Sequence, residues 1–314
     1  MIKHSVNPPR FIDLQVNGYA GVDFNNSDLS AEDMRLACER LRGDGIGQVL
    51  ATVITDDPAQ MAARLANIAG ACQTDQLVRE VVYGIHIEGP FLNPGEGTVG
   101  AHPAPFVRAP NQAVMQSLLD AAQGLTRLVT LAPEIEGGQQ LIRFLVDQGV
   151  VVSAGHCDPS RDELSAAIDA GLSMFTHLGN GCALKLDRHD NIVQRVLSLS
   201  DQIWCCFIGD GIHIPPFALA NYLKIAGVER SIVVSDAMAA AGLGPGKYRL
   251  GSIDVEVDDQ NRALLADGDG RLAGSVATVP LLQSVLEDQV GLSRREVERL
   301  MIDNPKTALG MKPE

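Results

Sequence analysis

The amino-acid sequence predicts an α/β fold, a (β/α)8 TIM barrel, and three features of the chain lead to this expectation. Short apolar, β-branched runs recur eight times along the 314 residues. Between these runs lie stretches with apolar residues at spacings of three and four, which is typical of helices packed on one face. Strands that alternate with helices form parallel sheets, and eight such units close into a barrel more naturally than they form an open sheet.

The predicted strands are short and rich in valine, isoleucine and leucine, as the buried strands of a parallel sheet are. They cover residues 11–16, 48–54, 81–87, 125–131, 150–154, 172–175, 203–208 and 231–234. The clearest helical patterns lie between them, at residues 31–41, 58–72, 111–122, 138–148, 161–170 and 216–226. Two further helices are predicted at residues 276–289 and 294–302.

One region departs from this alternation. Residues 248–267 read as short alternating strands, with turn signals at residues 258–261 and 267–270. We therefore expect a small β insertion, at about residues 245–270, after the eighth strand. The whole chain, residues 1–314, is expected to form a single barrel domain, because barrels of this size commonly do.

The chain is acidic. It has 25 Lys and Arg against 39 Asp and Glu, which gives a net charge of −14 and a pI of about 4.9. Such a surface repels nucleic acid and anionic membrane, so we expect neither as a partner. An anionic small molecule would need a local cationic pocket.

The six cysteines form no CxxC pair, and a chain of this size needs no disulfide framework. We expect buried, reduced thiols and therefore a cytoplasmic protein. Residues 1–10 lack the apolar core of a signal peptide, and no apolar run is long enough to span a bilayer.

Polar residues gather just after the C-terminal ends of the predicted strands. In a barrel these ends converge, and catalytic groups are built there from several strands. The set comprises Gln15, Asn17, Glu88, His156, His177, Asn180, Asp210, His213 and Asp236.

Three of these residues have the chemistry of a metal site. Glu88, His156 and His177 supply one carboxylate and two imidazoles, which is the ligand set of a catalytic zinc ion with one position left for water. Iron or cobalt would accept the same set. The metal would acidify its water and polarise a carbonyl, and Asp236 would accept the water's proton and pass it to a leaving amine. The set predicts amide hydrolysis without a covalent intermediate.

Each of these residues taken alone has a structural interpretation. A single histidine is more often a hydrogen-bonded core residue than a ligand, and an aspartate after a strand is often a helix cap. The coincidence of four of the seven histidines, Glu88 and Asp236 at the same end of different strands favours the functional interpretation. His86 either shares the face of Glu88 or packs among the helices, and we interpret it as structural.

Seven short stretches follow the order of a known family over nearly the whole chain. They are residues 11–18 (FIDLQVNG), 86–93 (HIEGPFLN), 153–156 (SAGH), 176–180 (THLGN), 210–213 (DGIH), 235–237 (SDA) and 272–275 (LAGS). Together they make the chain resemble the N-acetylglucosamine-6-phosphate deacetylases, metal-dependent enzymes of the amidohydrolase superfamily. The resemblance implies a hydrolase of amino sugar metabolism that cleaves the acetyl amide of N-acetylglucosamine 6-phosphate or a related sugar, giving acetate and the free amine.

The resemblance also implies roles for individual residues. Glu88, His156 and His177 correspond to the metal ligands, Asp236 to the catalytic acid and base, and His102 to the histidine that polarises the substrate carbonyl. Contacts with the substrate are implied for Ala101, Asn180, Gly181, Arg188, His213, Leu272, Ala273 and Gly274.

Among these contacts, His213 and Arg188 correspond to the phosphate and sugar contacts. The family's arginine reaches into the site of the neighbouring subunit, so a homodimer is implied.

Gln15 and Asn17 bear on the number of metal ions. Many members of the superfamily have a His-x-His pair at this place, which binds a second metal, whereas this chain has two amides. An amide is a poor ligand for a transition metal compared with imidazole. We therefore expect one divalent ion, zinc, with iron, cobalt and manganese as alternatives.

The chain departs from the family in places that bear on its substrate. Most of the family's small β domain is missing, the segment around Arg188 is unusual, and Cys182 stands where the family has methionine. The neighbouring carboxylates of Arg188 could also hold it in a surface ion pair. Two alternatives therefore remain: an amidohydrolase for another N-acyl or cyclic amide, and an inactive metal-binding barrel.

Overall fold

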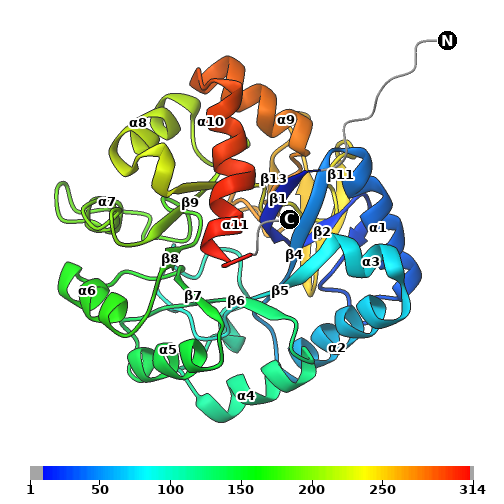
Figure 1. Cartoon of the computed structure of the whole chain (residues 1–314), viewed down its shortest axis with the longest axis horizontal. Helices are drawn as coiled ribbons and strands as arrows, with labels where there is room; N and C mark the ends of the chain where they lie inside the picture. Colours follow the sequence, from blue (N-terminus) through cyan, green and yellow to red (C-terminus); the bar gives the residue numbers. More distant parts are fainter. Residues whose placement is uncertain (1–9, 312–314) are drawn as a thin grey trace.

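Eight parallel strands form the centre of the computed structural model, which describes residues 10–311 (Figure 1). Along the sheet they are β1 (Phe11–Val16), β4 (Ile46–Ile54), β5 (Val82–Glu88), β6 (Thr126–Leu131), β7 (Val151–Ala154), β8 (Met174–Phe175), β9 (Trp204–Ile208) and β10 (Ser231–Val234). A parallel bridge between Val16 and Ala237 joins the first strand to the end of the last. The predicted (β/α)8 barrel is therefore confirmed.

The strands lie where the sequence predicts them, with small differences at their ends. β1 and β10 have the predicted bounds, and β4 begins two residues earlier than predicted. β8 is shorter than predicted, with two residues in place of four. The expectation about a signal peptide falls on residues 1–10, of which residues 1–9 lie outside the described part of the chain.

The helices surround the barrel as a ring (Figure 1). The predicted ones are α1 (Ala31–Gly43), α2 (Pro58–Thr74), α4 (Gln112–Ala121), α5 (Gly138–Asp147), α6 (Arg161–Asp169) and α8 (Pro216–Ala226). Their starts are encoded locally: Ser30 and Ser160 each form a capping box, and Pro58 is the first residue of α2.

Three α-helices of the described residues were not predicted: α3 (Gln76–Val81), α7 (Ile192–Leu197) and α11 (Asn304–Ala308). Each has five or six residues, too few for a helical period to stand out. The C-terminal region contains α9 (Val279–Ser284), α10 (Arg294–Glu298) and α11 (Asn304–Ala308), and π-helical turns follow α9 and α10. No helix of the described residues has the length and apolar character needed to cross a bilayer.

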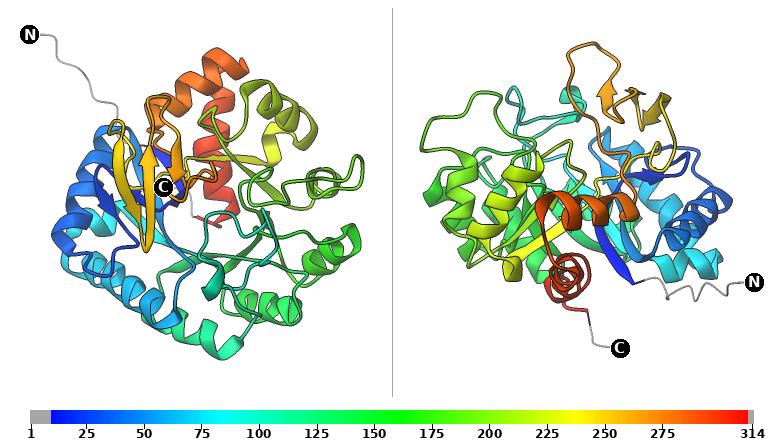
Figure 2. Two further views of the ribbon diagram at one scale, coloured as in Figure 1. Left: turned by 180° about the vertical axis from the view of Figure 1, so that it is seen from behind. Right: turned by 90° about the horizontal axis from the view of Figure 1, so that it is seen from above.

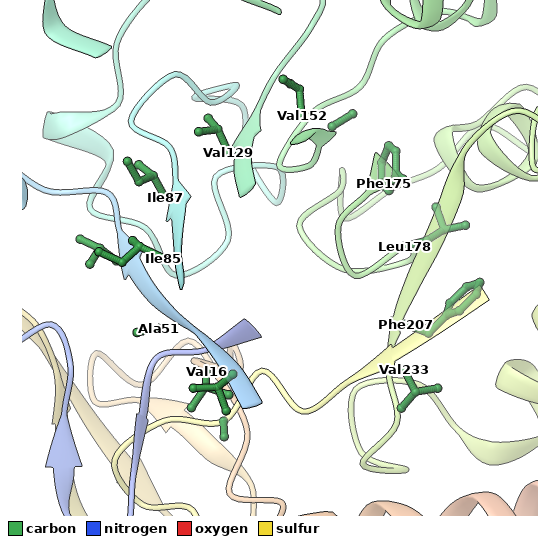
Figure 3. Close-up of a cluster of buried hydrophobic side chains, with 14 of the residues drawn as sticks. Val16, Ala51, Ile85, Ile87, Val129, Val152, Phe175, Leu178, Phe207 and Val233 are labelled. Atoms are coloured by element: carbon green, nitrogen blue, oxygen red, sulfur yellow. The ribbon is translucent and has the colours of Figure 1, made fainter. Parts of the chain in front are cut away.

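The barrel strands are buried on both faces. Their outward side chains form a ring that packs against the helices, as Figure 3 shows for Ile87, Val129 and Phe207 among others. The inward side chains near one end form a second apolar cluster that includes Leu14, Leu50 and Ile232. At the other end the inward side chains become polar, and that change marks the site.

Three antiparallel strands follow the barrel's last strand: β11 (Gly246–Leu250), β12 (Ile253–Val257) and β13 (Ala263–Leu265). They rise above the ring on the side opposite α11 (Figure 2). The apolar face of this small sheet packs with Ile54 and Met238, from the ends of β4 and β10, so it is held over the C-terminal ends of the strands.

Candidate metal centre and active site

A cavity of about 930 Å³ opens at the C-terminal ends of the barrel strands. It collects most of the residues that the sequence predicts for the site, although they come from segments far apart in the chain. The predicted residues that line it are Gln15, Asn17, Glu88, Ala101, His102, His156, His177, Asn180, Gly181, His213, Asp236, Leu272 and Gly274.

Three buried side chains converge at the bottom of this cavity. His177 Nε2 lies 3.1 Å from Glu88 Oε1 and 3.1 Å from His156 Nε2, and His156 Nε2 lies 3.3 Å from Glu88 Oε1. The edges of a tetrahedron with metal–ligand bonds of about 2.0–2.1 Å measure about 3.3–3.4 Å. The three side chains therefore have both the chemistry and the spacing of ligands to one divalent ion.

The backbone turns sharply at three site residues. His156, His177 and Asp236 follow their strands with φ values of 51°, 35° and 53°. Residues other than glycine rarely adopt this left-handed region, and such strain occurs mostly at functional sites. The turn directs each side chain toward the barrel axis instead of continuing along the strand.

Hydrogen bonds from outside the set fix the orientation of His156 and Glu88, whereas the buried Nδ1 of His177 has no partner among the described residues. His156 Nδ1 donates to the carbonyl of Thr98 at 2.8 Å, which leaves Nε2 as the nitrogen available to a metal. Gln15 Nε2 lies 3.2 Å from both carboxylate oxygens of Glu88. Thr98 could not be predicted from the sequence, because it acts through its backbone carbonyl.

The titration of these groups reflects their proximity. Burial raises the pKa of Glu88, but the neighbouring imidazoles of His156 and His177 outweigh it and bring the pKa well below its usual range. Burial lowers the pKa of His177, whereas Glu88 raises it, and the result is a raised pKa. The carboxylate is thus kept ionised, which is the form that binds a metal.

Asp236 also lines the cavity, and its pKa is shifted in the opposite direction to that of Glu88. Burial, followed by the charge of Glu88, raises its pKa from 3.8 to about 7. Asn17 Nδ2 donates to Asp236 Oδ1 at 2.8 Å and opposes that rise. A carboxylate with a pKa near neutrality can both accept and return a proton.

His102 reaches the same group from a loop. Its Nε2 lies 3.1 Å from His156 Nε2, and its Nδ1 accepts from the backbone N–H of Thr55 at 3.4 Å. Burial and the neighbouring His156 lower the pKa of His102 to about 3, so the ring is neutral. With Nδ1 as the acceptor, Nε2 carries the hydrogen and can donate to a carbonyl oxygen.

His213 also lines the cavity, and a residue with no predicted role holds it. Asp210 Oδ2 accepts from His213 Nδ1 at 2.7 Å and from Ser275 Oγ at 2.9 Å. Asp210 Oδ1 accepts from two backbone N–H groups, those of Ile212 and His213. The bond to Nδ1 fixes the orientation of the His213 ring, so Nε2 is the nitrogen left for a ligand.

A layer of hydroxyl groups supports the site from below and was also missed. Thr130 Oγ1 lies 2.7 Å from Thr176 Oγ1 and 2.8 Å from His86 Nε2, and Ser153 Oγ lies 2.7 Å from Thr176 Oγ1. His86 is fully buried inside the barrel, on the face of Glu88. Of the two places considered for it, packing among the helices is therefore wrong.

Two predicted substrate residues lie outside the cavity of this chain. Arg188 is exposed on the loop after β8 and makes no ion pair with any described residue. Ala273 is fully buried beneath the small sheet, so within this chain the expected contact falls to its neighbours Leu272 and Gly274.

The alternative of a surface ion pair for Arg188 fails because the carboxylates beside it have other partners. Asp187 accepts from two backbone N–H groups, and Asp190 pairs with Arg195.

All six cysteines are free, as expected, but the expectation that all are buried is wrong for one of them. Cys182 is partly exposed and lines the cavity, next to Gly181.

Comparison with known proteins identifies the family. No family model matches the chain. The chain is 31% identical to the N-acetylglucosamine-6-phosphate deacetylase of Bacillus subtilis over 309 residues, which cover 98% of this chain and 76% of that protein. It is 32% identical to the N-acetylgalactosamine-6-phosphate deacetylase of Escherichia coli O157:H7, over 96% of this chain and 78% of that protein.

Solved structures agree with this result. The N-acetylglucosamine-6-phosphate deacetylase of Mycobacterium smegmatis, in complex with its N-acetylated sugar phosphate, superposes with a TM-score of 0.87 at 31% identity, over 96% of this chain and 77% of that one. The enzyme of Thermotoga maritima gives a TM-score of 0.85 at 27% identity. The chain belongs to the N-acetylglucosamine-6-phosphate deacetylase family of the amidohydrolase superfamily and is a carbon–nitrogen hydrolase.

Proposed function

We propose that this chain hydrolyses the acetyl amide of an N-acetylhexosamine 6-phosphate, giving acetate and the free amino sugar phosphate. The observation that carries the proposal is the convergence of Glu88, His156 and His177 within 4.8 Å of one another, next to a buried Asp236 whose pKa is about 7. A metal-binding set beside a carboxylate able to exchange protons is what amide hydrolysis without a covalent intermediate requires.

Glu88, His156 and His177 would hold one divalent ion, zinc, with iron, cobalt and manganese as alternatives. The amides of Gln15 and Asn17 act as donors, to Glu88 and to Asp236. They are therefore committed to orienting carboxylates and do not supply a second ligand set. When bound, the ion acidifies a water molecule and polarises the amide carbonyl.

The chain's own residues carry the protons and orient the substrate. Asp236 accepts the proton of the attacking water on its carboxylate and returns it to the nitrogen of the leaving amine. His102 donates from Nε2 to the carbonyl oxygen, where negative charge develops as the water adds to the carbonyl carbon. Asn17 keeps the carboxylate of Asp236 aimed at the reacting atoms through its 2.8 Å hydrogen bond.

The sugar would occupy the outer part of the cavity, against Ala101, Asn180, Gly181, Leu272 and Gly274. His213, held by Asp210, is available to the sugar or its phosphate. The comparisons support a hexosamine but do not separate its two epimers, because the relatives named for N-acetylglucosamine and for N-acetylgalactosamine match about equally well.

The phosphate needs a cation that the cavity of one chain does not supply. The one Arg or Lys among the described residues that line it is Arg271, and its guanidinium is bonded to Asp267, Asp269 and the carbonyl of Gly100. Arg188 is exposed on a projecting loop and free of ion pairs with described residues. We therefore propose a homodimer in which each Arg188 reaches the phosphate in the other subunit's cavity.

Two broader expectations remain proposals. The free thiols support a cytoplasmic location. The apolar cluster shared by the small sheet and the strand ends supports a single catalytic domain with a β insertion.

Turnover by metal-replete protein tests the function. The substrates are N-acetylglucosamine 6-phosphate, N-acetylgalactosamine 6-phosphate and the two unphosphorylated sugars, and the readout is free amine together with acetate. We expect release from at least one phosphorylated sugar, at a higher kcat/KM than from its unphosphorylated form. Equal kcat/KM for the phosphorylated and unphosphorylated forms would refute recognition of the phosphate group. Release of amine only from other N-acyl or cyclic amides would support the alternative hydrolase. No release from any of these sugars or amides would support the alternative of an inactive metal-binding barrel.

A further inference from the structure

The loop that carries His102, residues 93–102, lies directly on the ring of His156. The carbonyl of Thr98 accepts from His156 Nδ1 at 2.8 Å, and His102 Nε2 lies 3.1 Å from His156 Nε2. The rings of the two histidines meet edge to face with their centroids 4.3 Å apart. The position of this loop therefore sets the position of two site histidines together.

Gly100 is the point of closest approach. Its φ is +58°, and a Cβ added there would stand 2.9 Å from His156 Cε1. The backbone of the loop thus packs against the imidazole with no room for a side chain. A small outward displacement of Gly100 would open this contact and move His102, which follows two residues later.

A side chain from the far end of the chain holds Gly100 from the opposite side. Arg271 Nη1 donates to the carbonyl of Gly100 at 2.8 Å, across 171 residues of sequence. The rest of the guanidinium is anchored on its own segment, where Asp267 accepts from Nη2 at 3.1 Å and Asp269 accepts from Nε. That segment is fixed to the small sheet, because Leu265 N–H donates to the carbonyl of Arg271 at 2.9 Å.

We propose that Arg271 is a positioning residue that fastens the His102 loop to the small β insertion and so keeps His102 in place for the reaction. The inference rests on the proposed function only for what His102 does. The β insertion therefore has a role at the site. It holds the His102 loop from the outside through Arg271, and the barrel holds the same loop from the inside through His156.

The charges around Arg271 exclude the competing role of phosphate ligand. All three of its nitrogens are already engaged, and two carboxylates accept from it. An incoming phosphate would meet more negative than positive charge at this place. Arg262 offers a matched comparison: it also pairs with an aspartate of its own turn, Asp258, but does not line the cavity.

The test compares Arg271→Ala, Arg271→Lys and the control Arg262→Ala in the metal-replete full chain. The first readout is amide hydrogen exchange, which needs no substrate. In the loop, the N–H groups of Val99, Gly100 and His102 donate to loop carbonyls. We expect Arg271→Ala to speed the exchange of these amides about tenfold or more, since it removes one charged hydrogen bond. Arg271→Lys should restore part of the protection, and Arg262→Ala should leave it unchanged.

The second readout is kinetic. Displacement of one catalytic group lowers rate by about ten- to a hundredfold, so Arg271→Ala should lower kcat by that factor with little change in KM. Combined with His102→Ala it should add almost nothing, because its effect passes through His102.

Three results would overturn the proposal: unchanged loop exchange in Arg271→Ala, a rise in KM alone, or full additivity with His102→Ala. If wild type deacetylates none of the sugars but Arg271→Ala still loosens the loop, the proposed function fails while the fastening by Arg271 stands.

Discussion

Replacement of Asn17 by leucine should move the acid limb of the pH profile upward. Asp236 acts as a base in its ionised form, so kcat/KM rises with pH through the pKa of Asp236, which burial and the charge of Glu88 raise and a bound cation lowers. The donor Asn17 Nδ2, 2.8 Å from Asp236 Oδ1, stabilises that ionised form. Without this donor the ionised form of Asp236 is less stable relative to the protonated form. The pKa of Asp236 therefore rises, and a higher pH is needed for activity.

The size of the shift follows from the strength of this bond. A hydrogen bond to a charged group contributes about 1.5–3 kcal/mol, and one pKa unit corresponds to about 1.4 kcal/mol. Using the lower figure, the limb should move up by about one pH unit. At a given pH on the acid side of the limb, kcat/KM then falls about tenfold, whereas on the alkaline plateau the two proteins converge.

The assay is kcat/KM from pH 5.5 to 9.5 at saturating metal. Stability gives an internal control: Asn17 Oδ1 is buried without a described partner, so leucine removes one unsatisfied atom and thermal unfolding should change little. An unmoved limb with a uniform loss of rate would refute the role of Asn17 in tuning Asp236, and a limb that moves to lower pH would refute the sign of the argument.

Further substitutions separate the proton transfer, the phosphate contact and the packing of the barrel. Asp236→Asn should keep its metal but lose about two to four orders of magnitude in kcat, and near-normal turnover would contradict its role as acid and base. Arg188→Ala should raise KM for the phosphorylated sugar and leave the unphosphorylated sugar almost unchanged; equal effects on both would exclude a phosphate contact. Leu65→Ala, fully buried on α2, should lower the free energy of unfolding by about 2–5 kcal/mol in urea titration, and a change under about 1 kcal/mol would contradict tight packing there.

The strands and longer helices could be predicted from the sequence because their signals are local. A run such as that of β10 is buried on both faces and is apolar after its first residue, Ser231, and Ser160 with Glu163 marks the start of α6 within four residues. α3 and α7 were missed since six residues span fewer than two helical turns, and their place is fixed by packing against neighbours.

The site could be predicted in part for the same reason. Metal-binding and titratable side chains at strand ends, such as Glu88 and His156, can be recognised once the strands have been predicted. Residues that support the site through common groups cannot be predicted in this way. The carbonyl of Thr98, the hydroxyl of Thr130 and the guanidinium of Arg271 have a role only because of the residues that they contact in the folded chain. The left-handed backbone conformation of His177 likewise depends on the folded barrel and could not be predicted from the residue type.

Metal content tests the central claim most directly. After metal loading and desalting, elemental analysis should find one divalent ion per chain, and His177→Ala, His156→Ala and Glu88→Ala should each lose most of it. His189→Ala, which removes an exposed imidazole from the loop after β8, should keep the full content. Two ions per wild-type chain, or an undiminished ion in any of the three site variants, would contradict a single metal centre built from these side chains.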